Sequence, residues 1–164
     1  MKPLLAICIL IALSAAPALS QTPAGSDAFS YYVGTWSCLG GPTDSPAVKA
    51  AITAVMNDGL LTEHVSVPVQ GGMPAAFSQT FTLAYNPRTK LYSQVQSDNF
   101  GGWSVSKASP WTGNTEEWTD VATVDGKLGH GQTVRTDQNH YTVTGYASTG
   151  TAPNFKATCE RGST

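Results

Sequence analysis

The sequence has little charge, few cysteines and no long apolar run beyond its first residues. Its nine lysines and arginines are outnumbered by eleven aspartates and glutamates, so the net charge is −2 at pH 7. The cations are spread singly along the chain and form no basic patch. Because nucleic-acid binding needs clustered positive charge, we expect no nucleic acid as a partner.

Familiar catalytic and metal-binding motifs are also missing. The three histidines, His64, His130 and His140, show neither HxH nor HxxxH spacing, so no metal site is predicted. The chain has no Gly-x-Ser-x-Gly elbow that would present a serine nucleophile. These motifs therefore identify no catalytic residue and give no positive sign of an enzyme.

The first 20 residues are typical of a secretory signal peptide. Lys2 precedes an apolar run from Leu4 to Leu13, and small residues follow as far as Ser20. The run is shorter than the roughly 20 apolar residues that span a bilayer. We expect cleavage before Gln21, a secreted or periplasmic mature protein, and no integral membrane segment after cleavage.

The rest of the chain predicts one all-β domain over residues 29–164, after a polar, flexible lead-in over 21–28. Apolar and polar residues alternate between turn signals about every ten residues, and at most one helical turn (27–32) precedes them. Ten short strands joined by hairpins favour an antiparallel up-and-down β-barrel, because closure removes exposed edges; a two-sheet sandwich is the alternative. The predicted strands are 33–39, 47–56, 60–67, 76–85, 90–97, 103–107, 115–124, 128–135, 140–147 and 154–161.

Two cysteines, Cys38 and Cys159, lie beyond the signal segment. In an oxidising compartment they predict one disulfide. If they lie opposite each other on antiparallel strands, the same register places Trp36 opposite Arg161. Arg161 would then stack on the Trp36 ring, a contact worth roughly 0.5–2 kcal/mol. Gly34 would leave room for this approach, and the first and last strands would close the barrel.

The Gly34-x-Trp36 pair on the first strand, with Arg161 near the chain end, resembles the calycin superfamily of lipocalins and their relatives. The closest resemblance is to uncharacterised secreted bacterial proteins with a ten-stranded, lipocalin-like barrel. It implies a small apolar or amphipathic ligand inside the barrel. The start is also similar to that of the haem-binding nitrobindins, although Cys38 replaces a glycine of that pattern. Haem is therefore an alternative, and no other cofactor is expected.

Turn sequences suggest which side chains face the interior. The Asp125-Gly126 hairpin places Trp118, Glu116 and Arg135 on one face. An opposite-charge pair between Glu116 and Arg135 would assign that face to water. The following hairpin then points His130 inward, opposite Gly145.

The predicted interior combines apolar side chains with many amides. Unpaired buried amides are costly, so their number suggests water or a ligand with polar groups; the alternative is that the glutamines bond to one another. The predicted ligand-binding residues are His130, Gln132, Tyr141, Glu63 and Gln94.

Three further functions remain open. The first is a small barrel enzyme that uses Glu63 and His130 as an acid–base pair. The second is haem binding through His130. The third is a protein-interaction module that uses residues 99–111, including Trp103 and Trp111.

Overall fold

The computed structural model of the protein describes residues 25–70 and 73–162. A 3-10 helix, η1 (Gly25–Tyr31), precedes ten β-strands. The strands are β1 (Gly34–Pro42), β2 (Val48–Asn57), β3 (Leu60–Val67), β4 (Phe77–Asn86), β5 (Leu91–Asp98), β6 (Trp103–Ala108), β7 (Thr115–Thr123), β8 (Gly129–Arg135), β9 (His140–Ala147) and β10 (Phe155–Arg161). The predicted signal segment lies outside the described residues.

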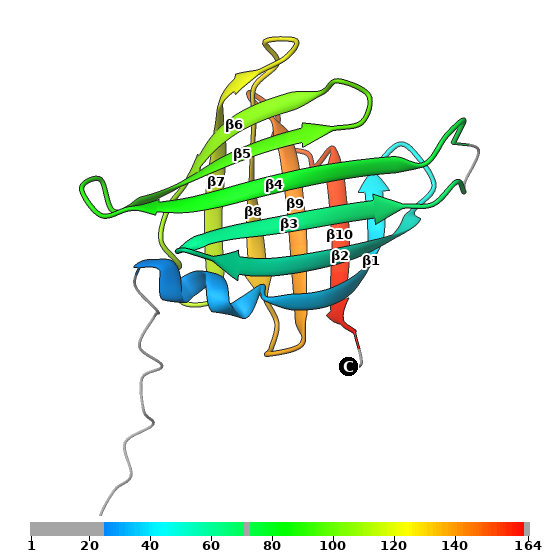
Figure 1. The fold of residues 1–164 in the computed structure, drawn as a ribbon. Helices are drawn as coiled ribbons and strands as arrows, with labels where there is room; N and C mark the ends of the chain where they lie inside the picture. Colours follow the sequence, from blue (N-terminus) through cyan, green and yellow to red (C-terminus); the bar gives the residue numbers. More distant parts are fainter. Residues whose placement is uncertain (1–24, 71–72, 163–164) are drawn as a thin grey trace, which may run out of the picture.

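The ten strands form one closed antiparallel barrel in which each strand pairs with its sequence neighbours (Figure 1). β1 pairs with both β2 and β10, so the first and last strands complete the ring. Every strand thus has a partner on both sides, which removes the exposed edges of an open sheet. The predicted up-and-down barrel is confirmed, and the sandwich alternative is wrong.

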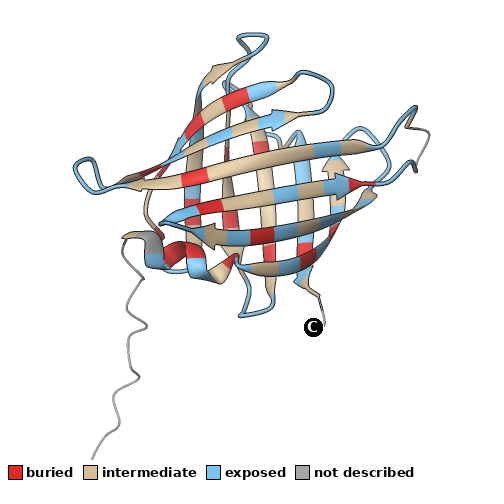
Figure 2. Ribbon diagram, viewed as in Figure 1, coloured by how far each residue is buried: buried red, intermediate tan, exposed pale blue. Residues whose placement is uncertain are grey.

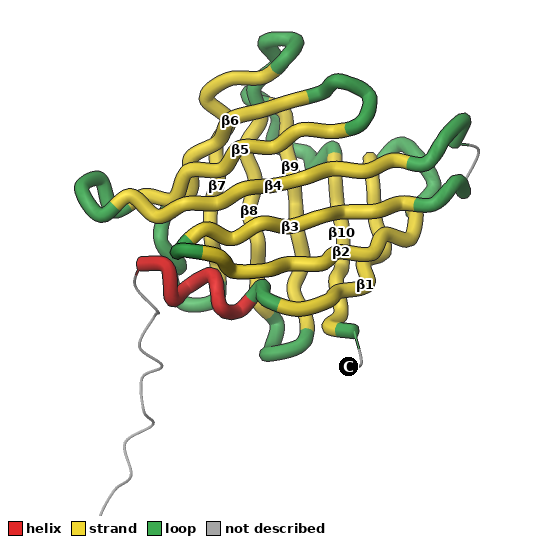
Figure 3. The backbone as a smooth tube through the Cα atoms, in the orientation of Figure 1, coloured by secondary structure: helices red, strands yellow, loops and turns green. Residues whose placement is uncertain are grey.

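Helix η1 lies across one end of the barrel (Figure 3). Ala28 and Phe29 are fully buried there, and the Phe29 ring lies 4.9 Å from the ring of Tyr92 on β5. Residues 25–28, which the sequence placed in a flexible lead-in, belong to this helix. The domain begins earlier than predicted because these residues cover apolar side chains at the barrel end.

The predicted register between the first and last strands is confirmed. Cys38 and Cys159 are opposite each other and joined by a disulfide, and Trp36 faces Arg161. The Arg161 guanidinium lies 4.1 Å from the centre of the Trp36 ring and donates hydrogen bonds to the carbonyls of Tyr31 and Val33. A side chain at Gly34 would lie 3.1 Å from Arg161 Nη1, so glycine leaves the guanidinium its space.

For two hairpins, β2–β3 and β4–β5, the turn sequences predict correctly which side chains face the interior and which face outward. A two-residue turn at Asp58-Gly59 predicts that Ala54 lies opposite Glu63; the φ angles of 48° and 79° fit such a turn, and the pairing is confirmed. The turn over residues 86–89 predicts Tyr92 opposite Leu83, whereas Tyr92 pairs with Tyr85 in the structure. That two-residue shift leaves the faces unchanged.

The two hairpins that flank β8 differ from the prediction. In the β7–β8 hairpin, His130 pairs with Thr119 instead of Val121. The Asp120 carboxylate accepts the Gly129 N–H at 2.9 Å, so the loop around Asp125-Gly126 is longer than a two-residue turn.

In the β8–β9 hairpin, His130 pairs with Tyr146, and Gly145 faces Gly131. The Thr136 N–H donates to the His140 carbonyl, and the Asp137 carboxylate accepts from the Asn139 N–H. The loop is therefore one residue shorter than predicted, and a one-residue change moves side chains to the other face.

Burial differs along the barrel. A core of buried apolar and aromatic residues surrounds η1, whereas many inward positions farther along the strands are only partly buried (Figure 2). No helix in the described part of the chain is long and apolar enough to cross a membrane.

Candidate binding site inside the barrel

An aromatic cluster closes the barrel next to η1. Tyr32, Trp36, Trp111 and Tyr141 are each at most 5% exposed. The Tyr141 ring centre lies 4.8 Å from that of Trp36 and 5.7 Å from that of Tyr32. The Trp36 indole donates to the Tyr32 carbonyl at 2.7 Å, which ties the first strand to the helix end. We name these four residues the floor of the barrel.

Two carboxyl groups face the interior beside the floor. Glu63 lies on β3 between Ala54 and Phe81, and Glu116 lies on β7 with only 4% of its surface exposed. The Tyr32 hydroxyl donates a hydrogen bond of 3.0 Å to Glu116 Oε2. The other carboxyl oxygen, Oε1, is buried and has no hydrogen-bond partner among the described residues. Such an oxygen is a strong acceptor that has lost its water.

Burial changes the acidity of these groups. Loss of water raises the pKa of Glu63 to about 7, and the negative charge of Glu116 adds to this rise. Burial likewise raises the pKa of Glu116 to about 7, although the Tyr32 hydrogen bond and the charge of Arg135 oppose it. The pKa of Tyr141 is also raised, first by burial and then by the charge of Glu63. Glu63 therefore interacts electrostatically with both Glu116 and the floor.

Arg135 is a cation that acts on Glu116. Its guanidinium lies 3.5 Å from the centre of the Trp111 ring and 4.2 Å from that of Tyr31, and donates to the Ala28 carbonyl at 3.2 Å. Within the described residues it makes no ion pair with a carboxylate, and its Nε atom has no partner. Arg135 thus packs on aromatic rings and does not neutralise either carboxyl group through a direct ion pair.

Farther from η1, the inner face of the barrel is a mixture of apolar and amide side chains. Val65 is an example of the apolar side chains and Gln94 of the amides, and each keeps part of its surface exposed. A packed core would bury such positions, as it buries Leu61 and Leu83 nearer the helix. The partly exposed inward residues are Ile52, Val65, Gln79, Phe81, Gln94, Gln96 and Val143.

The structure brings together three of the five predicted site residues. Glu63, Gln94 and Tyr141 face the interior, although Tyr141 is part of the packed floor. The prediction that His130 and Gln132 face the interior is wrong.

Gly131, which lies between His130 and Gln132, shows which face of β8 is inside. A side chain at Gly131 would meet the Trp118 ring, so Gly131 faces inward with Trp118. His130 and Gln132 therefore face outward. The expected water-facing pair is also wrong, because Glu116 is buried inside and pairs with Thr133 rather than Arg135.

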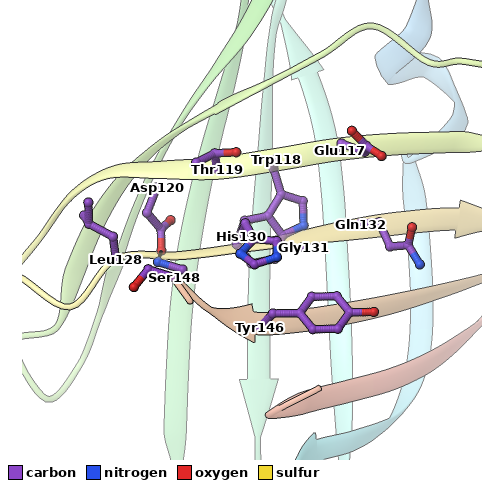
Figure 4. A pocket seen from close by; sticks show the side chains of 11 residues that line it. Glu117, Trp118, Thr119, Asp120, Leu128, His130, Gly131, Gln132, Tyr146 and Ser148 are labelled. Carbon is purple, nitrogen blue, oxygen red and sulfur yellow. Dashed lines mark hydrogen bonds between the residues drawn. The ribbon is translucent and has the colours of Figure 1, made fainter. Parts of the chain in front are cut away.

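On the outside of the barrel, His130 and Gln132 line an open groove of about 440 Å³ between β7, β8 and β9. His130 and Tyr146 lie on neighbouring strands along this groove (Figure 4), and their rings stack with centres 5.1 Å apart. Glu117 and Thr119 line the same groove from β7. The groove is therefore a surface feature, separate from the interior carboxyl groups.

This placement removes the acid–base pair suggested by the sequence. His130 and Glu63 lie on opposite faces of the barrel wall, so they do not form a proton-transfer pair across the interior.

His64 is exposed on the outer face of β3, and His140 contacts Asp137 at the start of β9. None of the three histidines is placed to ligate a haem inside the barrel. Among residues 25–70 and 73–162, no three His, Cys, Asp or Glu side chains gather to hold a metal ion.

The two proposed interaction tryptophans have different environments. Trp111 is 3% exposed and forms part of the floor, whereas Trp103 on β6 is 45% exposed. The segment over residues 99–111 therefore contributes one residue to the core and one to the surface.

Three functional residues were missed by sequence reasoning. Glu116, Arg135 and Tyr32 lie in the site, and two of them had been assigned to water because their charges are opposite. The available signal was Gly131 within β8, because a glycine inside a strand often marks the close approach of another group, here the Trp118 ring.

No protein-family model matches the chain, and no match was found among curated proteins. Among solved structures, a redesigned β-barrel is similar, with 14% sequence identity and a TM-score of 0.47. The alignment covers 82% of this chain and 94% of that one. The description of the barrel rests on its own strand pairing.

Proposed function

We propose that the protein is a secreted or periplasmic binding protein that holds a small, partly apolar molecule inside its barrel. The observation that carries this proposal is the partial exposure of Val65, Gln94 and the other inward side chains beyond the floor. Inward residues that stay accessible offer a ligand both apolar contact and hydrogen-bonding amides, the usual mixture in small-molecule sites.

Two further features support the proposal. The Cys38–Cys159 disulfide is compatible with an oxidising compartment, as the signal-like first residues also suggest. The stacking of Arg161 on Trp36 agrees with the resemblance to calycins, whose barrels typically enclose small apolar molecules.

The test is a titration with a neutral fluorescent lipophile, N-phenyl-1-naphthylamine, which should show a saturable rise in emission. Val65→Phe adds bulk inside the barrel and should weaken binding about tenfold, or about 1.4 kcal/mol. Ser66→Phe is the matched control, because the adjacent Ser66 side chain faces outward and is exposed. Its affinity should equal that of the wild type.

Two results would contradict the proposal. Absence of saturable binding to the wild type would remove the evidence for an interior site. If Val65→Phe instead lowers the free energy of unfolding by about 1–3 kcal/mol, the interior is a packed core that has been overfilled.

A further inference from the structure

We infer that the barrel interior recognises a protonated amine, whose ammonium group binds Glu63 and Glu116 beside the floor while its apolar body lies against Val65 and Phe81. The inference deepens the proposed binding function and rests on it. It names the ligand class: a small amphipathic amine.

First, Glu63 keeps part of its surface accessible to a ligand. This residue is only partly buried, although Leu61, two positions away on the same face, is fully buried. Its strand neighbours Thr62 and His64 point to the outer face, since side chains alternate along a strand. The accessible part of Glu63 therefore faces the interior, which places a carboxyl group where a ligand inside the barrel can reach it.

The second argument is the unpartnered oxygen of Glu116. Tyr32 donates to Oε2, but Oε1 is buried and accepts no hydrogen bond from any described residue. A buried carboxyl oxygen without a donor is costly. An ammonium group carries three donors and no acceptor, so it supplies what Oε1 lacks and can also reach a second carboxylate.

The third argument is charge. Glu63 and Glu116 bring two potential negative charges to the interior, and Arg135 lowers the pKa of Glu116 without forming an ion pair with either carboxyl group in the described part of the chain. Arg135 is already held by the Ala28 carbonyl and two aromatic rings. The second nearby cation, Arg161, is likewise held by the Tyr31 and Val33 carbonyls and the Trp36 ring. A bound ammonium group would therefore be the direct charge partner that the two carboxylates lack among the described residues, whereas an anionic ligand would add a further negative charge beside them.

The aromatic surroundings favour the same class of ligand. Phe81 pairs with Glu63 on the neighbouring strand, and Tyr32 and Tyr141 form the adjacent part of the floor. An ammonium ion over an aromatic face gains roughly 0.5–2 kcal/mol, more when water is excluded. A neutral alcohol with the same tail gains neither this contact nor the charge interaction.

Binding should depend on pH. The titratable and charged groups around the ammonium position are Glu63, Glu116, Arg135 and Arg161, together with the hydroxyls of Tyr32, Tyr92 and Tyr141, which stay neutral because burial raises the pKa of each. Both glutamates have a pKa of about 7, so an amine binds at lower pH only by displacing a proton. Amine affinity should fall by up to about tenfold per pH unit below 7 for each proton released.

The experiment compares octylamine, octanol and octanoate, which share one tail, by calorimetric titration of the full chain at pH 8 and pH 5.5. Octylamine should bind at least about tenfold more tightly than octanol at pH 8, and octanoate should bind more weakly than octanol. Glu63→Gln and Glu116→Gln should each reduce the preference for octylamine, whereas octanol affinity should stay constant. Glu117→Gln is the control, because Glu117 is exposed on the outer face beside Glu116.

The outcomes separate the two proposals. Equal saturable binding of octylamine and octanol would overturn the amine inference and leave interior binding intact. Failure of all three compounds and of the neutral lipophile to bind would overturn both. A preference for octylamine that survives both Glu63→Gln and Glu116→Gln would place the recognised charge elsewhere and would also overturn the inference.

Discussion

At the scale of single residues, Glu116 combines a costly electrostatic environment with a defined contact. It is 4% exposed, one of its oxygens has no partner, and its pKa is raised to about 7 mainly by burial. Glu63 has a pKa of about 7 for the same leading reason. Both groups therefore retain protons in the folded protein at pH values where the unfolded chain, with pKa values near 4.5, has released them.

This difference in pKa between the folded and unfolded states determines whether the free energy of unfolding rises or falls with pH. Below about pH 4.5 both states are protonated, and these groups have no effect on stability. As pH rises towards about 7, the unfolded state loses protons first, so the free energy of unfolding falls and the loss is complete above that pH. We expect Glu116→Gln to be more stable than the wild type at pH 8 by about 1–3 kcal/mol. The two proteins should be equally stable at pH 4.5.

Urea denaturation across this pH range checks the prediction. Glutamine keeps an acceptor for the Tyr32 hydroxyl, so the variant removes the charge and preserves the hydrogen bond. Glu117→Gln, one position away on the outer face, should leave the pH profile unchanged. A Glu116→Gln protein that is no more stable than the wild type at pH 8 would show that Glu116 is not held in a costly environment.

At the scale of elements, β1 and β10 show what the sequence could predict. Two cysteines in one oxidising compartment determine a pairing, and that pairing aligns Trp36 with Arg161 through a fixed register. The tight turn at Asp58-Gly59 likewise allows only one pairing for β2 and β3. A disulfide fixes register without knowledge of the rest of the fold, and a two-residue turn does so where it forms, as at Asp58-Gly59 but not at Asp125-Gly126.

The faces of β7 and β8 show why the rest could not be predicted. Opposite charges at Glu116 and Arg135 suggested water, yet both side chains enter the interior. Arg135 is accommodated by the Trp111 and Tyr31 rings, and Glu116 by Tyr32. These partners come from η1, the segment after it and the β6–β7 connection, which are distant in sequence, so no local pattern reveals them. Glu116 and Arg135 were therefore not recognised from the sequence as residues of the candidate site.

Helix η1 provides a test at the same scale. Phe29 is fully buried against Tyr92, so Phe29→Ala leaves a cavity where the helix covers the barrel end. We expect the free energy of unfolding to fall by about 3–5 kcal/mol. Ser30→Ala is the control in the same helix, because Ser30 is exposed and its hydroxyl bonds only to the Asp27 carbonyl. It should change stability by less than about 0.5 kcal/mol in thermal and urea denaturation.

A small effect of Phe29→Ala would contradict the role given to η1. In that case the barrel end would remain closed without the helix, and the burial of Ala28 and Phe29 would contribute little to the stability of the fold.

At the scale of the whole molecule, closure depends on the two ends of the chain meeting. The sequential strand order makes every pair local except β1 with β10, which joins residues 121 positions apart through Cys38 and Cys159. Bringing such distant segments together carries the largest loop-closure cost in the barrel. The disulfide removes much of this cost by restricting the unfolded chain.

Removing the disulfide should therefore weaken the whole barrel. The paired substitution Cys38→Ala and Cys159→Ala should lower the free energy of unfolding by up to about 5 kcal/mol, since the closed loop spans more than a hundred residues. Urea denaturation followed by tryptophan fluorescence measures the loss. Because Trp36 lies beside the bond on β1 and Trp111 lies with it in the floor, their emission reports on the seam and on the closed end of the barrel. If the barrel unfolds as one cooperative unit, the emission of Trp36 and that of Trp111 change at the same urea concentration. Unchanged stability in the paired variant would mean that hydrogen bonds and the stacking of Arg161 on Trp36 suffice to close the ring.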